Sequence, residues 1–597
     1  MKKDNDLDFD PEVLRKKYKE ERDKRIRPDG ANQYIGIEGE FSNYIDDPYI
    51  KEKITREPLY DEMDVVVIGG GFAGLLAAGR LKEVGIEKVR IVEKAGDFGG
   101  TWYWNRYPGA ACDTEAYIYL PLLEELNYMP KNKYAYAPEI FAHCKRIASH
   151  YNFYEHACLQ TEVTGLEWEE ATSRWIIKTN HKDAMRAKFV ILCNGPFNRP
   201  KLPGIPGINT YKGHTFHTSR WDYAYTGGDA NGHLEKLKDK KVAIIGTGAT
   251  SVQCIPHLGA SAKELYVFQR TPSSIDVRDN RPTDPAWVKD LQAGWQQERM
   301  DNFNAITSGK LVEQDLVMDG WTEIISNLVS LQKFRGTNID PAEIPKLMEL
   351  ADFKKMESIR ARVDTIVKDP KTAEALKPYY RQFCKRPCFH DEYLPTFNRE
   401  NVFLVDTKGK GVQTITEKGV MVDGQLYEVD CIIFATGFEV GTGYSRRAGY
   451  DPIGKNGVSL SEKWADGIRT LHSFHVHNFP NLFIIGHAHG GYTTSYTHSF
   501  DIKAKHLRYI IEACLKRGIK EVEVTQEAEQ AWVDEIIHVY RDQAAFNAAC
   551  TPGYYNFEGN TSLLVAQNSS YGRGPIRYFK RLKDWRDEGN MVGLEFR

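Results

Sequence analysis

Two glycine-rich turns have residue types and a spacing that suit the binding of a pyrophosphate. The first contains Gly69, Gly71 and Gly74 in the pattern GxGxxG, directly after the apolar run VVVI and before a helix-forming segment. Glycines at these positions allow a tight turn, let the backbone approach a pyrophosphate and let the helix pack on the strand. The second contains Gly246 and Gly248, and Ser251 takes the place of the third glycine. Each turn predicts a dinucleotide site at the start of a helix.

The residue that ends the next strand distinguishes the two predicted ligands. Glu93 closes the strand after the first turn, where a carboxylate accepts hydrogen bonds from the ribose 2′-hydroxyl of an adenosine. After the second turn Gln269 stands in that position, and Arg270 and Thr271 follow it. A guanidinium binds a 2′-phosphate, which a carboxylate would repel. We therefore expect FAD at the first site and NADPH at the second.

Two longer stretches lie between the glycine turns, GGTWYWNRYPGAACD at 99–113 and YKGHTFHTSRWD at 211–222. With the two turns, they resemble the type I Baeyer–Villiger monooxygenases, which contain FAD and depend on NADPH. Gly213, His217, Trp221 and Asp222 fit the family fingerprint FxGxxxHxxxW followed by Pro or Asp, and Tyr211 replaces its Phe. The first stretch fits another pattern of the family at Gly100, Trp102, Tyr107, Pro108, Gly109 and Asp113.

The resemblance implies roles for further residues. Arg386 corresponds to the family's catalytic arginine, Asp113 to its carboxylate partner, and Lys385 to a lysine that faces the 2′-phosphate of NADP. In this family a flavin peroxide anion attacks a ketone carbonyl, and a fixed cation stabilises both the peroxide and the oxyanion that forms. Arginine keeps its charge in a dry site, whereas lysine can lose it. Family positions around the flavin correspond to Thr101, Trp102, Tyr103, Trp104 and Tyr119.

His217 and Trp221 lie in the connection between the two nucleotide-binding regions. Being four residues apart, they share one face if this segment is helical. We expect them to couple the motions of the two domains and not to perform chemistry; simple packing in a linker is the alternative. Heteroatom-oxidising relatives usually carry Tyr or Phe in place of Trp221, so the pair Trp221-Asp222 favours ketone oxidation.

The elements that must position these residues follow from the hydrophobic pattern. Strand, glycine turn and helix recur at 64–82 and 240–258, strands are expected again at 401–407, 427–438 and 481–491, and a long helix at 495–518. Residues 10–27 predict a short helix with a solvated surface, a partner-binding role being the alternative.

We expect an α/β fold with two Rossmann-like domains that interleave along the chain. Residues 1–55 form an N-terminal extension, and 280–380 form a helical insertion. The FAD-binding domain is expected to comprise the two segments 56–199 and 438–597. The NADPH-binding domain lies between them and is expected to comprise the two segments 200–279 and 381–437, which flank the insertion.

Composition excludes several other classes of protein. In 597 residues, 79 Lys and Arg stand against 82 Asp and Glu, a balance that argues against nucleic-acid binding. No apolar run reaches the ~18 residues of a membrane helix, and the N-terminus resembles no leader peptide, so we expect a cytoplasmic protein. The ten cysteines are too sparse for a disulfide scaffold and predict buried, reduced thiols. No metal is expected, although histidines are frequent between 472 and 498.

The predicted reaction is the NADPH- and O₂-dependent insertion of one oxygen atom beside a ketone carbonyl, giving an ester or lactone. The N-terminal extension, the stretch GAACDTEAYIYLPLLEE and the segment TPGYYNFEG resemble the subgroup that accepts large-ring, polycyclic or steroid ketones. Two alternatives stay open: an S- or N-oxidising flavin monooxygenase, and a non-catalytic nucleotide-binding protein whose extension recruits partners. The sequence does not specify an oligomeric state.

Overall fold

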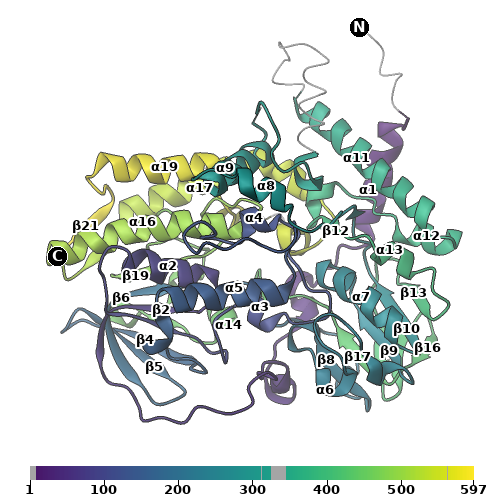
Figure 1. Ribbon diagram of the computed structural model, residues 1–597, viewed down its shortest axis with the longest axis horizontal. Coiled ribbons are helices and arrows are strands. Elements are labelled where there is room, and N and C mark those ends of the chain that lie inside the picture. The colour runs from purple at the N-terminus through teal and green to yellow at the C-terminus, as the bar shows by residue number, and fades with distance from the viewer. Residues whose placement is uncertain (1–7, 311, 324–343, 561) are drawn as a thin grey trace, which may run out of the picture.

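The computed structural model describes residues 8–310, 312–323, 344–560 and 562–597, and places two sheets side by side (Figure 1). The first sheet mixes parallel and antiparallel strands. Its strand order is β18 (Pro452–Ile453), β4 (Val163–Glu169), β5 (Arg174–Thr179), β6 (Ala184–Leu192), β2 (Glu62–Ile68) and β3 (Val89–Val92), with β19 (Leu482–Ile484) also paired to β6. Strands that precede and follow the second sheet in the sequence therefore build this sheet.

The second sheet is entirely parallel. Its order is β13 (Val402–Asp406), β10 (Glu264–Gln269), β9 (Lys241–Ile245), β17 (Cys431–Phe434) and β8 (His214–His217). The strands that follow the two glycine turns, β3 and β10, have predominantly buried side chains. Near-continuous apolar strands of this kind are typical of parallel sheets covered on both faces. The predicted α/β class with two Rossmann-like sheets is confirmed.

The predicted helices lie where the pattern placed them. Each glycine turn leads into a helix, α2 (Phe72–Lys82) and α7 (Ala249–Ser261). The long helix α16 (Tyr496–Lys516) packs on α2 and ends before Gly518, whose φ of +67° suits glycine. The region expected to be a helical insertion contains α8 (Pro285–Asp290), α9 (Trp295–Thr307), α11 (Ile344–Ile366) and α12 (Pro370–Leu376); its residues 311 and 324–343 lie outside the described residues.

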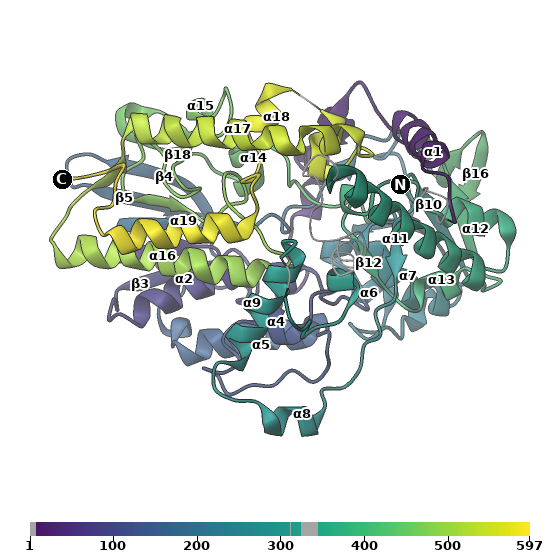
Figure 2. The ribbon, with the colours of Figure 1, turned by 90° about the horizontal axis from the view of Figure 1, so that it is seen from above.

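The N-terminal segment forms the predicted helix, α1 (Pro11–Asp23), but one face of this helix is not solvated. Tyr18 is buried against Phe353 of α11, with ring centroids 5.2 Å apart, and Arg15 pairs with Glu349 at 2.8 Å. Both views place α1 beside α11 (Figures 1 and 2). Further along, β1 (Tyr34–Ile35) pairs with β7 (Leu202–Pro203). The described part of the N-terminal extension, residues 8–55, therefore packs on the rest of the chain.

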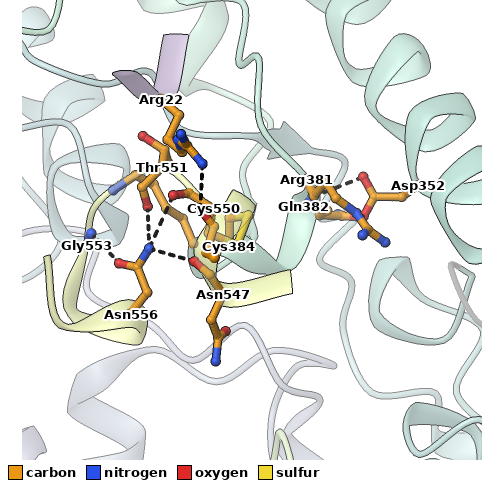
Figure 3. Close-up of a disulfide and its surroundings, with 12 residues drawn as sticks. Arg22, Asp352, Arg381, Gln382, Cys384, Asn547, Cys550, Thr551, Gly553 and Asn556 are labelled. Atoms are coloured by element: carbon orange, nitrogen blue, oxygen red, sulfur yellow. Dashed lines mark hydrogen bonds and ion pairs between the residues drawn. A yellow bond between two sulfur atoms is a disulfide. The ribbon is translucent and has the colours of Figure 1, made fainter. Parts of the chain in front are cut away.

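One prediction about cysteine is wrong. Cys384 and Cys550 form a disulfide, with Cα atoms 5.1 Å apart, whereas eight cysteines are free and buried as expected. Cys384 ends the 3₁₀ turn η7 (Gln382–Cys384), and Cys550 follows the helix α17 (Gln526–Ala549). The partners are 166 residues apart and only tertiary packing brings them together, so their spacing could not reveal the pair. Figure 3 shows the bridge joining the two segments.

Candidate active site

A single cavity of about 830 Å³ brings the two glycine turns together. Its walls also include residues of the N-terminal segment, the segment 384–386, the link 435–438 and the C-terminal loop around 553–558. These pieces are far apart in the sequence. Fourteen of the predicted site residues line the cavity: Gly69, Gly71, Glu93, Thr101, Trp102, Trp104, Asp113, Tyr119, Gly246, Gly248, Arg270, Thr271, Lys385 and Arg386.

The first glycine turn has the geometry that close approach to a phosphate requires. Gly69 has φ +113°, and a Cβ there would lie 2.3 Å from the carbonyl oxygen of Cys193. Gly74 does not line the cavity; a Cβ on it would lie 1.9 Å from the carbonyl oxygen of Gly69, so this glycine permits packing of helix on turn. Gly71 begins α2 without a side-chain cap. The first N–H groups of α2 are therefore available to an anion.

Glu93 holds this turn as well as lining the cavity. Its carboxylate accepts hydrogen bonds from the backbone N–H of Gly70 at 2.6 Å and of Ala95 at 2.8 Å. Burial raises the pKa of Glu93 above its ordinary value, and the two backbone donors oppose that shift. Each carboxylate oxygen can accept a second hydrogen bond, so the residue fits an adenosine ribose while it fixes the loop.

The second turn repeats this arrangement on the other sheet. Gly246 has φ +114°, and a Cβ there would lie 2.4 Å from the carbonyl oxygen of Ala435. Gly248 begins α7 without a side-chain cap, and a Cβ on it would meet nothing within 4 Å, so this position is open to the cavity. Ser251 is fully buried in the first turn of α7 and does not line the cavity. Two uncapped helix starts thus face one space, which fits two dinucleotides.

Arg386 and Asp113 meet as the resemblance implied. Arg386 Nη2 lies 3.7 Å from Asp113 Oδ2, the carboxylate is 3% exposed and the arginine side chain is 28% exposed. Burial opposes the charge on Arg386, but the Asp113 carboxylate together with Tyr555, Tyr554 and Cys112 raises the pKa of Arg386 above its ordinary value. The indole N–H of Trp321 donates to the backbone carbonyl of Asp113 at 2.9 Å, and its ring lies 5.6 Å from the guanidinium. The pair holds the Arg386 guanidinium, a positive charge, in a fixed place on the cavity wall.

Curated proteins resemble this chain over almost its whole length. It is 52% identical over 591 residues to the neopentalenolactone D synthase of Streptomyces avermitilis, covering 98% of this chain and 99% of the relative. It is 50% identical over 596 residues to a Baeyer–Villiger monooxygenase of Stachybotrys chlorohalonatus, covering 99% and 95%. The chain is a type I Baeyer–Villiger monooxygenase. The enzymes of this family are FAD- and NADPH-dependent, and structures of relatives contain both FAD and NADP.

Two further comparisons agree with the fold. The family model described as pyridine nucleotide-disulphide oxidoreductase matches residues 66–315, which contain both glycine turns. The solved polycyclic ketone monooxygenase of the fungus Thermothelomyces thermophila is 37% identical, has a TM-score of 0.90 and covers 98% of this chain and 99% of its own. Within the described residues of this monooxygenase, no helix has the length and apolar character needed to cross a bilayer.

The family fingerprint is not helical in this monooxygenase. His217 ends the strand β8, the 3₁₀ turn η4 (Thr218–Arg220) follows, and Trp221 is extended, so the two side chains do not share a helix face. The expected shared face depended on a helical segment, and parallel pairing of β8 with β17 prevents one. His217 contacts Phe438 in the second link between the sheets, with ring centroids 5.7 Å apart, and burial lowers its pKa to about 3.

The other fingerprint residues also lie outside the cavity wall. Trp221 is buried and donates from its indole N–H to Thr226 Oγ1 at 3.1 Å. Asp222 Oδ1 caps the next helix by accepting from the backbone N–H of Tyr225, and its Oδ2 lies 2.9 Å from His214 Nε2. Gly213 precedes β8. All four residues therefore lie within or close to β8, the edge strand of the second sheet.

The aromatic positions divide into two groups. The short helix α3 (Thr101–Trp104) presents Thr101, Trp102 and Trp104 to the cavity, and the Trp102 indole N–H donates to the Tyr119 hydroxyl at 3.0 Å. Tyr103 is buried outside the cavity wall, where its hydroxyl donates to Asp47 at 2.7 Å.

One residue of this centre was missed by sequence reasoning. Arg278 Nη2 lies 3.7 Å from Asp113 Oδ1, so the carboxylate is held between two arginines, and the same nitrogen donates to the carbonyl of Cys112 at 3.0 Å. Arg278 follows β11 (Ile275–Asp276), which pairs with β12 (Cys388–Phe389) just after Arg386. This pairing brings the two arginines together, and nothing in the spacing of the sequence indicates it.

Proposed function

We propose that this monooxygenase uses NADPH and O₂ to insert one oxygen atom beside the carbonyl of bulky cyclic or polycyclic ketones, giving lactones or esters. One observation carries the proposal: a single cavity of about 830 Å³ contains two uncapped helix starts and the Arg386–Asp113 pair. The two helix starts suit two dinucleotides, and a substrate in the cavity would meet one fixed cation. Family membership favours this reaction over non-catalytic nucleotide binding.

In this proposal bound FAD would accept electrons from NADPH and activate O₂ for transfer of one oxygen atom to the ketone. Gly69, Gly71 and Glu93 hold its adenosine half, and Thr101, Trp102, Trp104 and Tyr119 surround its flavin half. Gly246 and Gly248 bind the NADPH pyrophosphate at the start of α7. The proposal includes two interleaved domains, 56–199 with 438–597 for FAD and 200–279 with 381–437 for NADPH.

Arg386 has the central chemical role. Its guanidinium stabilises the negative charge that develops on the substrate carbonyl oxygen, and such preorganised charge is commonly the largest contribution to catalysis. Asp113, held between Arg386 and Arg278, orients the guanidinium and offsets the cost of burying its charge. His217, Trp221 and Asp222 fix the connection through which the domains move relative to each other.

The names of two relatives support a bulky substrate. The structure that matches over 98% of this chain is titled polycyclic ketone monooxygenase, and the relative with 52% identity is named neopentalenolactone D synthase. We propose the same class of substrate here, a fused-ring or large-ring ketone. Oxygen and this ketone are the proposed small-molecule partners, and the cytoplasm is the proposed compartment.

The test is NADPH oxidation with a panel of ketones, together with mass detection of products that have gained one oxygen atom. The panel pairs cyclohexanone with polycyclic and steroid ketones at equal concentration. We expect kcat/KM to be at least ~10-fold higher for the bulky ketones, a difference of about 1.4 kcal/mol in transition-state binding. A clear preference for cyclohexanone would contradict the proposed substrate class, and absence of oxygenated products across the panel would contradict the reaction.

A further inference from the structure

Among the residues that line the cavity, the cations Lys201, Arg270 and Lys385 lie close to the carboxylate of Glu558. Arg270 Nη2 lies 3.9 Å from Glu558 Oε2, and Lys201 Nζ lies 3.8 Å from Glu558 Oε1. Lys385 Nζ donates to the carbonyl of Pro552 at 3.1 Å, in the loop that also carries Glu558. Burial lowers the pKa of Lys385 to about 8, with Arg270 adding to the shift and Glu558 opposing it. The positive charges of Arg270 and Lys201 therefore both disfavour the charged form of Lys385.

Lys201 is held firmly in this group although no motif contains it. It lies in the first of the two segments that connect the sheets, between β6 and β8. Its backbone N–H donates to the carbonyl of Gly437 at 2.9 Å, and its carbonyl accepts from Thr436 Oγ1 at 2.6 Å, so it is tied to the second connecting segment, 435–438. Its ammonium lies 3.6 Å from the ring centroid of Tyr34, and the side chain is 11% exposed. Tyr34 belongs to the N-terminal segment, which therefore helps to fix this charge.

Arg270 is positioned by the same segment. Its Nη1 donates to Gln33 Oε1 at 2.6 Å. The backbone carbonyl of Arg270 accepts from Arg25 Nε at 3.2 Å. A guanidinium with both its head and its backbone tied down loses little freedom when it binds an anion.

Glu558 is placed here by a backbone that few residues adopt. Phe557 and Glu558 have φ of +51° and +58°, a left-handed conformation that is unfavourable for residues other than glycine. Asn556 stabilises the loop: its side-chain amide donates to the carbonyls of Asn547, Cys550 and Thr551 (Figure 3). Glu558 Oε2 is buried and accepts no hydrogen bond from the described residues. The loop therefore holds this carboxylate in a fixed place, within 4 Å of both Lys201 and Arg270.

We propose that Lys201 is a third cation for the 2′-phosphate of NADPH, beside Arg270 and Lys385, and that Glu558 is a built-in anion that weakens binding of that phosphate. This inference rests on the proposed use of NADPH. These four side chains together carry two positive charges, which suits a phosphomonoester that carries close to two negative charges at neutral pH. Neutralising Glu558 removes repulsion, whereas removing Lys201 removes attraction, so the two changes act in opposite directions.

The experiment measures dissociation constants of NADP⁺ and NAD⁺ on the oxidised, FAD-loaded full chain by isothermal titration calorimetry. For Lys201→Met we expect ~10-fold weaker NADP⁺ binding, and for Glu558→Gln ~5-fold tighter binding, both with NAD⁺ changed less than ~2-fold. Lys201→Arg keeps the charge and should bind NADP⁺ within ~3-fold of the unchanged enzyme. Lys212→Met, at an exposed lysine near the same link, is the matched control and should change neither constant.

The outcomes separate this inference from the proposed function. An unchanged enzyme that binds NAD⁺ as tightly as NADP⁺ overturns both. Preference for NADP⁺ that is lost in Arg270→Met but kept in Lys201→Met overturns the role of Lys201 alone. Weaker NADP⁺ binding by Glu558→Gln would mean that the carboxylate orders the cations, and would overturn its role as an opposing charge. The flavin absorbance per chain establishes that each variant is folded before titration.

Discussion

Replacing Asp113 with Asn tests how the active centre holds its positive charge. The substitution keeps the shape of the side chain but removes the carboxylate that lies 3.7 Å from both Arg386 and Arg278. At that distance and an effective dielectric constant of about 20, each pair has a Coulomb energy of about 4 to 5 kcal/mol before desolvation is subtracted. Breaking a buried pair costs about 3 to 5 kcal/mol net. Since the Arg386 side chain is 28% exposed, we expect the lower end, about 3 kcal/mol.

That energy is the expected loss of stability, and the rate should fall as well because the released guanidinium no longer holds its position against the developing oxyanion. A loss of about 3 kcal/mol in transition-state stabilisation corresponds to a rate reduced by roughly 10²-fold. We expect Asp113→Asn to form lactone at roughly 1% of the normal rate and to release flavin at a lower temperature. The assay is product formation per bound flavin, combined with a thermal scan of flavin fluorescence.

Glu115→Gln is the matched control. Glu115 is 1% exposed and pairs with Arg299 at 2.6 Å, but it does not line the cavity. We expect it to lose a similar amount of stability and to keep its product formation per bound flavin. Normal lactone formation by Asp113→Asn, or an equal loss of rate in Glu115→Gln, would refute the reasoning.

Three further outcomes are expected. Arg386→Lys should reduce lactone formation by at least ~10²-fold while NADPH still bleaches the flavin absorbance; lactone formed at the normal rate would contradict the role of Arg386. Because burial lowers the pKa of Lys385 to about 8, NADP⁺ affinity should fall as pH rises through about 8, where the ammonium form is lost; Lys385→Met should bind weakly with a flatter profile, and identical profiles would contradict this. Cys384→Ser with Cys550→Ser should lower the unfolding temperature, with a chain-entropy ceiling of about 5 kcal/mol for 166 residues; a dithiol reductant should lower it in the unchanged enzyme and have no effect in the double variant.

The local sequence pattern predicted those parts of the site that a single segment of the chain forms. The helices after both glycine turns follow from the strand, turn and helix order, because the residue types that suit a pyrophosphate also shape the turn. Arg386 and Asp113 were found through family motifs, and the structure brings them together.

Residues that depend on tertiary pairing were not predictable in this way. Arg278 reaches Asp113 only because β11 pairs with β12, and Cys384 meets Cys550 across 166 residues. Lys201 and Glu558 belong to no motif, and their charges come within 4 Å of each other only because the fold brings the connecting segment and the C-terminal loop together. The fingerprint shows the converse: spacing of four suggested a helix face, but sheet pairing decided the conformation.

The most direct test of the reaction is the product made from one molecule that carries both a fused-ring ketone and a sulfide, incubated with the purified enzyme, NADPH and ¹⁸O₂. Fixed positive charge from Arg386 favours addition to a carbonyl, since it stabilises the oxyanion that results. We predict a lactone or ester that contains one ¹⁸O atom and an intact sulfide. A labelled sulfoxide with an intact ketone would contradict the account.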